Sequence, residues 1–232
     1  MFADNEVGSL NPISEIATIC QDANVAIHTD ATQAVGKVPI DLAKLPIDLL
    51  SLSGHKLYGP KGIGALFVRR KSPRLKLTPV LFGGGHESGF RSGTLPVHQI
   101  VGLGAACELC TKNMEEETPQ LESLCQRMET AIKERIIGTR FNGQLANKLP
   151  GNLHVTFSGV NSDALMNEVK DVVSLSSGSA CTTADPEPSH VLLAMGLPDE
   201  EIESSIRIGL GRFNDAAAVS YTHLTLPTKR IV

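Results

Sequence analysis

The order of apolar and polar positions in the first half of the chain predicts helices followed by short strands. In PISEIATICQDA, residues 12–23, apolar residues recur near helical spacing, and Val25 to Thr29 after it is expected to be a short buried strand. The apolar run IDLLSLS, residues 47–53, and the stretch GIGALFVRR, residues 62–70, are two further expected strands. This alternation of helix and strand predicts an α/β layer architecture.

Beyond a glycine-rich loop, GGGHESGFRSGT at residues 83–94, the pattern becomes helical. Residues 97–117 are expected to form one helix, and residues 120–136 a second, clearly amphipathic one. The apolar positions of the second helix recur every three or four residues: Leu121, Leu124, Cys125, Met128, Ile132 and Ile136. Such a stripe indicates a helix with one face against a core.

The last third of the chain mixes strands with short helices. NLHVTFSG, residues 152–159, alternates as a half-buried strand would, and SDALMNEVK, residues 162–170, is expected to be a helix. DVVSLSSGSACTT, residues 171–183, is expected to be a strand running into a loop, and SSIRIGLGRF, residues 204–213, a final strand.

This change of pattern predicts a domain boundary near residue 112. Residues 1–112 would form part of a large domain, and residues 113–219 a smaller α+β domain. The end, SYTHLTLPTKRIV at residues 220–232, has no helical period and is expected to be a non-native tail outside the fold.

Composition and charge narrow the class of protein. Of 232 residues, 41% are hydrophobic and 20% charged, and the net charge of −4 favours neither nucleic acid nor an anionic membrane as a partner. There is no apolar run of the roughly 18 residues that a membrane-spanning helix needs, and no signal-peptide pattern at the start. The cysteines are odd in number and irregularly spaced, which indicates reduced thiols and a cytoplasmic location: Cys20, Cys107, Cys110, Cys125 and Cys181.

A lysine and a carboxylate each follow an expected strand. Lys56 comes just after residues 47–53, and Asp30 ends the strand before it, with Gln33 one turn further on. Ligands of open α/β sheets bind beyond the carboxyl ends of strands, and pyridoxal phosphate needs a Schiff-base lysine and a carboxylate for its pyridine nitrogen. The alternatives are a solvated turn lysine and an aspartate that caps a helix.

Donors for a phosphate group are expected close to this lysine. Ser53 and His55 flank it in sequence, and Thr94 closes the glycine-rich loop. Each residue alone is a weak signal, but the combination with Lys56 and Asp30 is moderately specific.

Cys181 stands in a polar, glycine-containing stretch, SLSSGSACTTADPEPSH. An accessible thiol in such surroundings is a candidate nucleophile, whereas the alternative is a small buried hydrophobic residue. By contrast, CELC at residues 107–110 lies within a helical pattern, and the sequence has no second pair of this spacing, so no metal site is expected.

Arg207 is a candidate for gripping a small carboxylate. On a strand, Ile206 and Ile208 would point one way and Arg207 the other, with Gly209 beside it leaving space around the guanidinium. The alternative is a surface salt bridge. Asn5 is equally well explained as a turn residue.

Several long motifs in order resemble the NifS/IscS-like cysteine desulfurases, which are fold-type I pyridoxal-phosphate enzymes related to the class V aminotransferases. The resemblance covers residues 1 to about 219 and is carried by five stretches: HTDATQAVGKVPIDL, SLSGHKLYGPKGIGALFVRR, GGGHESGFRSGTLPVHQIVG, SSGSACTT and SSIRIGLGRF. It implies an α/β large domain with a mainly parallel sheet, followed by a smaller α+β C-terminal domain.

The resemblance also implies roles for the residues around the cofactor. Lys56 would be the Schiff-base lysine, Asp30 the partner of the pyridinium nitrogen, and Gln33 a contact of the phenolic oxygen. Ser53 and His55 would bind the phosphate.

Four further residues complete the implied site. Thr94 would reach the phosphate from the second subunit of a homodimer, and Asn5 would lie near both cofactor and substrate. Arg207 would hold the substrate carboxylate, while Cys181, on a long loop, would accept the sulfur of L-cysteine as a persulfide and release L-alanine. The sulfur would pass to acceptor or scaffold proteins that serve iron–sulfur cluster or thiolated-RNA biosynthesis.

Two features depart from the family pattern. Its members begin well before Met1, and that earlier segment carries phosphate-binding residues and a histidine that stacks on the cofactor ring; His28, His55 and His86 do not match it. We therefore expect an N-terminally truncated chain that by itself binds pyridoxal phosphate weakly. The usual C-terminal helix is also expected to be replaced by the tail.

Two other functions compete with the desulfurase. A selenocysteine lyase or related class V lyase would not depend on Cys181 for cysteine turnover. A non-catalytic subunit that docks sulfur-acceptor proteins would have no need of Lys56, Asp30, Gln33 and Cys181 together.

Overall fold

The computed structural model describes residues 1–70, 75–143, 147–177 and 188–225, so Cys181 lies outside the described residues. The chain forms two compact units. The first consists of Met1–Phe2 and Asn11–Met114, and the second of Ala3–Leu10 and Glu115–Val232. The short stretch Ala3–Leu10 thus packs with the second unit, whereas the sequence analysis grouped it with the large domain; the domain division itself stays a prediction.

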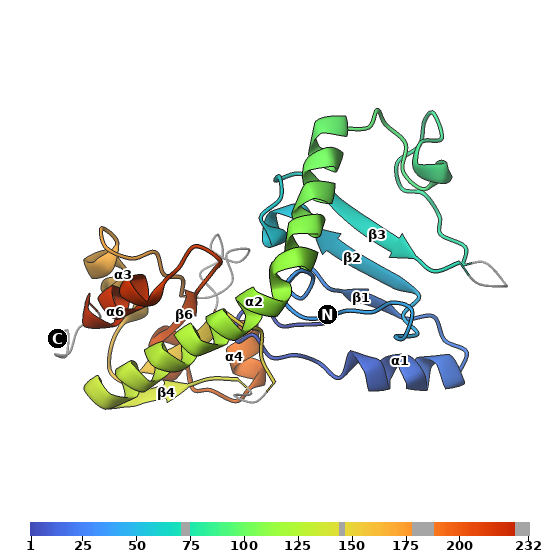
Figure 1. Ribbon diagram of the computed structural model, residues 1–232. Coiled ribbons are helices and arrows are strands. Elements are labelled where there is room, and N and C mark those ends of the chain that lie inside the picture. Colours follow the sequence, from blue (N-terminus) through green and yellow to red (C-terminus); the bar gives the residue numbers. More distant parts are fainter. Residues whose placement is uncertain (71–74, 144–146, 178–187, 226–232) are drawn as a thin grey trace. The chain divides into compact units, whose positions relative to one another are not determined.

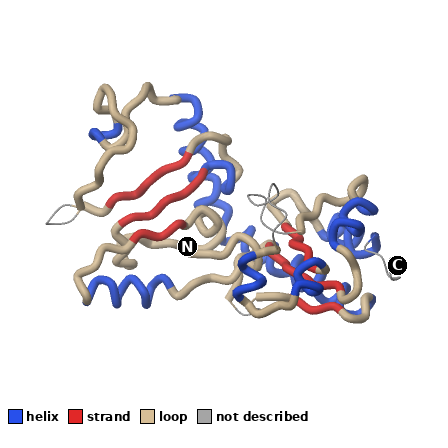
Figure 2. Tube along the Cα trace, turned by 180° about the vertical axis from the view of Figure 1, so that it is seen from behind, coloured by secondary structure: helices blue, strands red, loops and turns tan. Residues whose placement is uncertain are grey.

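The first unit is built on a three-stranded sheet, order β1-β2-β3 (Figures 1 and 2). Strand β1 (His28–Asp30) runs parallel to β2 (Leu49–Ser53), and β3 (Gly64–Val68) runs antiparallel to β2. Helix α1 (Ile13–Asp22) precedes β1, and the short 3₁₀ turns η1 (Gly54–Leu57) and η2 (Glu87–Gly89) lie in the connections.

This sheet is mixed, whereas the family resemblance implied a mainly parallel one. Among the strands of the described residues in this sheet, the β1–β2 pair is parallel and the β2–β3 pair is antiparallel. The physical reason is the connection after Ser53: it reaches Gly64 through η1 and a few turn residues, without a crossover helix. A parallel return needs a dozen or more residues, usually including a helix, so β3 comes back antiparallel.

The expected strand Val25 to Thr29 begins later than predicted. Asn24 adopts a left-handed backbone (φ 54°), and the N–H group of Val25 donates to the carbonyl of Cys20 at 2.8 Å. These residues therefore close the C-terminus of α1, and a donor used in a helix cap is not available to a sheet. Val25 is accordingly exposed, and β1 begins at His28.

The second unit contains an antiparallel sheet, order β4-β5-β6, formed by β4 (Thr139–Phe141), β5 (Asn152–Phe157) and β6 (Ser205–Gly209). Four helices belong to this unit: α3 (Ser162–Val169), α4 (His190–Ala194), α5 (Asp199–Glu203) and α6 (Ala216–Thr225). Long helix α2 (Val97–Arg135) contributes its second half.

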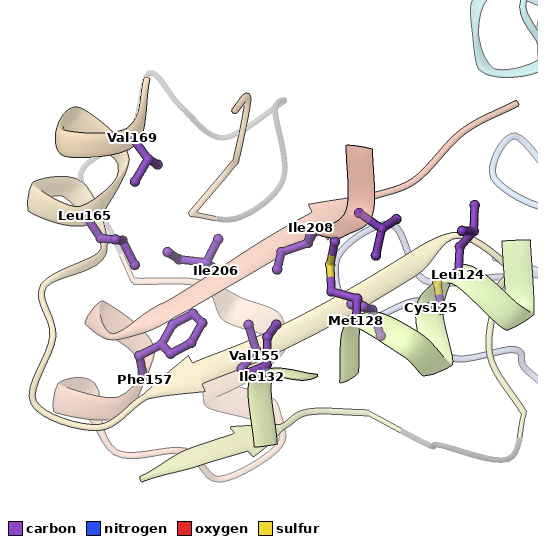
Figure 3. Packing of buried hydrophobic residues seen from close by; sticks show 12 residues of the cluster. Leu124, Cys125, Met128, Ile132, Val155, Phe157, Leu165, Val169, Ile206 and Ile208 are labelled. Carbon is purple, nitrogen blue, oxygen red and sulfur yellow. The ribbon is translucent and has the colours of Figure 1, made fainter. Parts of the chain in front are cut away.

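The apolar core of the second unit lies between α2 and the sheet. Met128 and Ile132 from α2 point toward Val155, Ile206 and Ile208 from β5 and β6 (Figure 3). The amphipathic stripe expected over residues 120–136 is confirmed, because Leu121, Leu124, Cys125, Met128 and Ile132 are all buried.

Two expectations about helices were wrong. The two helices expected at residues 97–117 and 120–136 are one continuous helix, Val97–Arg135, that includes Pro119, since a proline removes one hydrogen bond while the turns on both sides keep theirs. Residues 220–225, expected to have no helical period, continue α6 to Thr225. No helix within the described ranges has the length and apolarity required to cross a membrane.

Candidate active site

The carboxyl ends of β1 and β2 meet at one edge of the first sheet. Asp30 is the last residue of β1 and lies opposite Ser51, and β2 ends at Ser53, directly before the turn that carries Lys56. Because the two strands are parallel, the register puts Asp30, Ser51 and Ser53 on the same face of the sheet. Asp30 and the turn that carries Lys56, 26 positions further along the sequence, are thereby brought to one edge of the sheet.

A tight turn fixes the backbone of Lys56. A Cβ on Gly54 would lie 2.9 Å from the Cγ2 atom of Ile63, and one on Gly59 would lie 2.9 Å from the carbonyl oxygen of Gly54. Glycine at both positions allows this close approach, which the Gly59 N–H to Gly54 carbonyl hydrogen bond of 2.9 Å closes. Leu57 is fully buried below the turn, while Lys56 is half-buried.

Asp30 caps a turn and keeps one oxygen available. Its Oδ1 atom accepts a hydrogen bond of 2.8 Å from the backbone N–H of Thr32, at the start of the turn that contains Gln33. The sequence offered a helix cap as the alternative role of Asp30, but the residues that follow it form a turn and not a helix. Among the described residues, however, Oδ2 accepts no hydrogen bond, so the same carboxylate can receive a further donor.

Hydroxyl and imidazole groups surround the turn. The Ser53 Oγ and His55 Nδ1 atoms are 2.8 Å apart, and both groups are within reach of solvent. One strand position back on the same face, the Ser51 hydroxyl lies 3.2 Å from the Nε2 atom of His28. Sequence reasoning missed Ser51 and His28 as neighbours of the candidate site, although the two-residue period from Asp30 and Ser53 points to them.

Thr94 lies on a different part of the first unit. It is exposed on the stretch between the glycine-rich loop and α2, and no hydrogen bond connects it to the Lys56 turn within the described part of the chain. The stretch of chain from residue 80 to residue 101, which includes Thr94, has several exposed apolar side chains, among them Val80, Phe82, Val97 and Val101.

The second unit places Arg207 beside Asn5. The Nη1 atom of Arg207 donates a hydrogen bond of 2.6 Å to the carbonyl oxygen of Asn5. The expected alternation is confirmed: Ile206 and Ile208 are buried in the core, and a Cβ on Gly209 would meet no atom within 4 Å. Arg207 also pairs through its backbone with Ser176, the last bridged residue before the undescribed stretch that contains Cys181.

Each unit therefore holds one group of candidate residues. The first unit combines an amine, a carboxylate with an available oxygen, and a hydroxyl–imidazole pair. An amine for a Schiff base and a carboxylate for the pyridine nitrogen are groups that pyridoxal phosphate needs. The residues present fit this cofactor. No cluster of three metal-ligating side chains occurs in the described ranges.

Comparison with known proteins gives a consistent result. The aminotransferase class-V family model matches residues 1–221. The cysteine desulfurase IscS of Mannheimia succiniciproducens is 50% identical over 222 residues, which cover 96% of this chain and 54% of that protein. The chain thus spans about half the length of the curated relatives that it matches.

Two solved structures extend the similarity to the fold. A NifS-like protein from Rickettsia africae superposes with a TM-score of 0.87 at 31% identity, over 97% of this chain and 59% of that one. SspA in complex with cysteine has a TM-score of 0.72 at 36% identity, over 92% of this chain and 58% of that one.

Proposed function

The chain belongs to the aminotransferase class-V family, and on that premise we propose that the full-length protein is a pyridoxal-phosphate-dependent cysteine desulfurase. The observation that carries the proposal is the parallel β1–β2 pair, which brings Asp30 to the same sheet edge as the Lys56 turn. The cysteine in the SspA structure supports L-cysteine as the substrate.

The residues of the first unit hold the cofactor and move a proton. The Lys56 amine would hold the coenzyme aldehyde, the Asp30 carboxylate would lie against the pyridine nitrogen, and Gln33 would contact the phenolic oxygen. Ser53 and His55 donate to the phosphate. The cofactor supplies an electron sink for the Cα–H bond of the substrate. The Lys56 amine would take the Cα proton as a general base.

The residues of the second unit bind the substrate and accept its sulfur. Arg207 and Asn5 hold the substrate carboxylate. The Cys181 thiolate attacks the substrate sulfur, so that a sulfur–sulfur bond forms and the carbon–sulfur bond breaks. The products are L-alanine and a persulfide on Cys181, which passes sulfur to acceptor proteins for iron–sulfur cluster or thiolated-RNA biosynthesis.

The active form is a cytoplasmic homodimer in which Thr94 reaches the phosphate of the other subunit. Exposed apolar side chains between residues 80 and 101, the stretch that includes Thr94, support a second copy of the chain as their partner: Val80, Leu81, Phe82, Phe90, Val97 and Val101. Phe82→Glu in the full-length protein should convert dimer to monomer in light scattering; an unchanged mass would contradict the assignment.

Turnover by the purified full-length protein tests the function. We expect a cofactor absorption band, equal amounts of alanine and sulfide from L-cysteine with a thiol reductant, and loss of the band in Lys56→Ala. Cys181→Ser should stop cysteine turnover; if it does not, a selenocysteine lyase is favoured. A cofactor-free full-length protein would instead favour a docking subunit.

A further inference from the structure

One face of the second sheet is polar and yet buried. On β5, Leu153, Val155 and Phe157 face the apolar core, while His154 and Thr156 point to the opposite side and are 1% exposed. The stretch Ala3–Leu10 and helices α4 and α5 cover that side, where Val7, Leu192 and Ile202 pack together. Buried polar groups require hydrogen-bond partners, so their arrangement is informative.

The hydrogen bonds on this face have defined directions. The Arg140 guanidinium, which can only donate, bonds to Asn142 Oδ1 at 3.2 Å and so fixes the orientation of that amide. The Asn142 Nδ2 group then donates to Thr156 Oγ1 at 2.8 Å and to His154 Nδ1 at 3.1 Å. Because Nδ1 accepts, the proton of a neutral His154 is on Nε2.

The His154 Nε2 group faces the carboxylate of Glu6. Nε2 and Glu6 Oε1 are 3.7 Å apart, within ion-pair range but longer than a hydrogen bond. On its other side, Glu6 Oε2 accepts a hydrogen bond of 2.8 Å from the Ser189 hydroxyl, whose oxygen caps the N–H of Leu192 at 3.3 Å. Glu6, 2% exposed, is the shared acceptor at which donors from β5 and from the start of α4 converge.

Glu6 lies next to Asn5 and Arg207, the residues proposed to bind the substrate carboxylate. Asn5 is the neighbour of Glu6 in sequence, and its backbone carbonyl accepts the hydrogen bond from Arg207. His154 is the direct β5 partner of Arg207 on β6. Asp4 Oδ1 accepts hydrogen bonds from the backbone N–H groups of Glu6 and Val7, at 2.9 and 2.7 Å, and these two bonds close the turn that carries the Glu6 side chain.

We infer that Glu6 is a positioning residue for Arg207: held between His154 and Ser189, its carboxylate fixes the Asp4–Val7 turn so that the Asn5 carbonyl orients the guanidinium. The inference rests on the proposed function only in assigning a substrate carboxylate to Arg207. Glu6 itself touches neither the cofactor nor the substrate and acts through the turn.

The test separates orientation of Arg207 from general destabilisation. Glu6→Gln in the full-length holoenzyme places an N–H₂ donor opposite the donors of His154 and Ser189. We expect the KM for L-cysteine to rise about tenfold and kcat to change less than about threefold. Cysteamine has the same thiol and amine as L-cysteine but no carboxylate, so its inhibition constant as a competitor should be the same in Glu6→Gln as in the wild type. Glu203→Gln, an exposed glutamate on α5, is the matched control and should leave all constants as in the wild type.

A second pair of variants tests the same idea from Ser189. Ser189→Asp still accepts from Leu192 N–H but repels Glu6, and it should raise the KM for L-cysteine as Glu6→Gln does. Ser189→Asn caps equally well and donates to Glu6, so its KM should stay near the wild-type value.

Crystal structures of the cofactor-free variants provide a readout independent of turnover. In Glu6→Gln and Ser189→Asp, the Arg207–Asn5 hydrogen bond should be broken, and in Ser189→Asn it should persist. Equal loss of L-cysteine and cysteamine binding, or an intact Arg207–Asn5 contact in Glu6→Gln, overturns the inference. A wild-type protein without desulfurase activity overturns the proposed function instead, and leaves the structural readout to decide on Glu6.

Discussion

The two sheets of the molecule contain similar alternating strands but use their polar positions differently. In the first sheet, His28 and Asp30 are exposed and Ser51 and Ser53 half-buried, so these groups are accessible to a ligand. In the second sheet, Leu153 through Phe157 are buried on both faces, and the polar residues bond to one another. The comparison teaches that polar positions on a strand bind ligands where they are uncovered and support the fold where they are covered.

The largest expected effect separates activity from stability in the first unit. Lys56→Ala in the full-length protein should lower turnover of L-cysteine more than about a thousandfold, because in the proposed function Lys56 is the group that binds the coenzyme and moves the proton. Its free energy of unfolding without cofactor should change by less than about 0.5 kcal/mol, since Lys56 makes no hydrogen bond in the described residues. Steady-state kinetics and urea titration measure both; a comparable loss of stability would remove the distinction between the sheets.

The apolar face of the second sheet should respond in the opposite way. Met128 is 0% exposed between α2 and the sheet, so Met128→Ala should lower the free energy of unfolding by about 2–5 kcal/mol. Leu109→Ala, at an exposed position of the same helix, should change it by less than about 0.5 kcal/mol. Urea titration gives both values, and equal effects at the two positions would refute the core described here.

Matched changes at polar positions sharpen the comparison. Thr156→Val keeps the side-chain shape but removes the link between Asn142 and Ser205, and should destabilise the protein by about 1–3 kcal/mol. Ser53→Ala in the first sheet should leave stability within about 0.5 kcal/mol and weaken cofactor binding. Cofactor titration and urea unfolding of both variants measure the contrast; weakened cofactor binding only in Thr156→Val would reverse it.

The smallest effect concerns pH. Burial raises the pKa of Glu6, but the facing His154, the Ser189 hydroxyl and the charge of His190 together hold that pKa below its usual value of 4.5. The stability from ionised Glu6 is therefore present above about pH 4.5 and lost as the pH falls through the lower pKa of the folded state. Urea titrations across this range should show that the free energy of unfolding falls less with decreasing pH in Glu6→Gln than in the wild type. Parallel pH curves would indicate that Glu6 is not ionised in the folded protein.

Local patterns were sufficient to predict the elements that carry the site. Periodicity located α1, the amphipathic part of α2, and strands β2, β3 and β6 within a few residues. The position of Lys56 after a strand, and the opposite facing of Arg207 and Ile206, follow from the same periods. These features depend on residues close together in sequence, which is why the sequence contains them.

Hydrophobic periodicity did not predict three other features. The late start of β1 depends on the cap of α1 at Asn24, and the antiparallel β3 on its short connection. The closeness of Asp30 to the Lys56 turn depends on the parallel β1–β2 pairing, and the position of Cys181 is outside the described residues.

The sequence by itself determined which segments become helices and strands, because hydrophobic periodicity acts within a few turns. Only the tertiary structure decided that the polar side of β5 is buried, since its cover comes from both ends of the chain. The Glu6 carboxylate and the Ser189 hydroxyl are 183 residues apart in sequence and 2.8 Å apart in space. A local pattern cannot distinguish a strand face open to water from one that a remote segment covers.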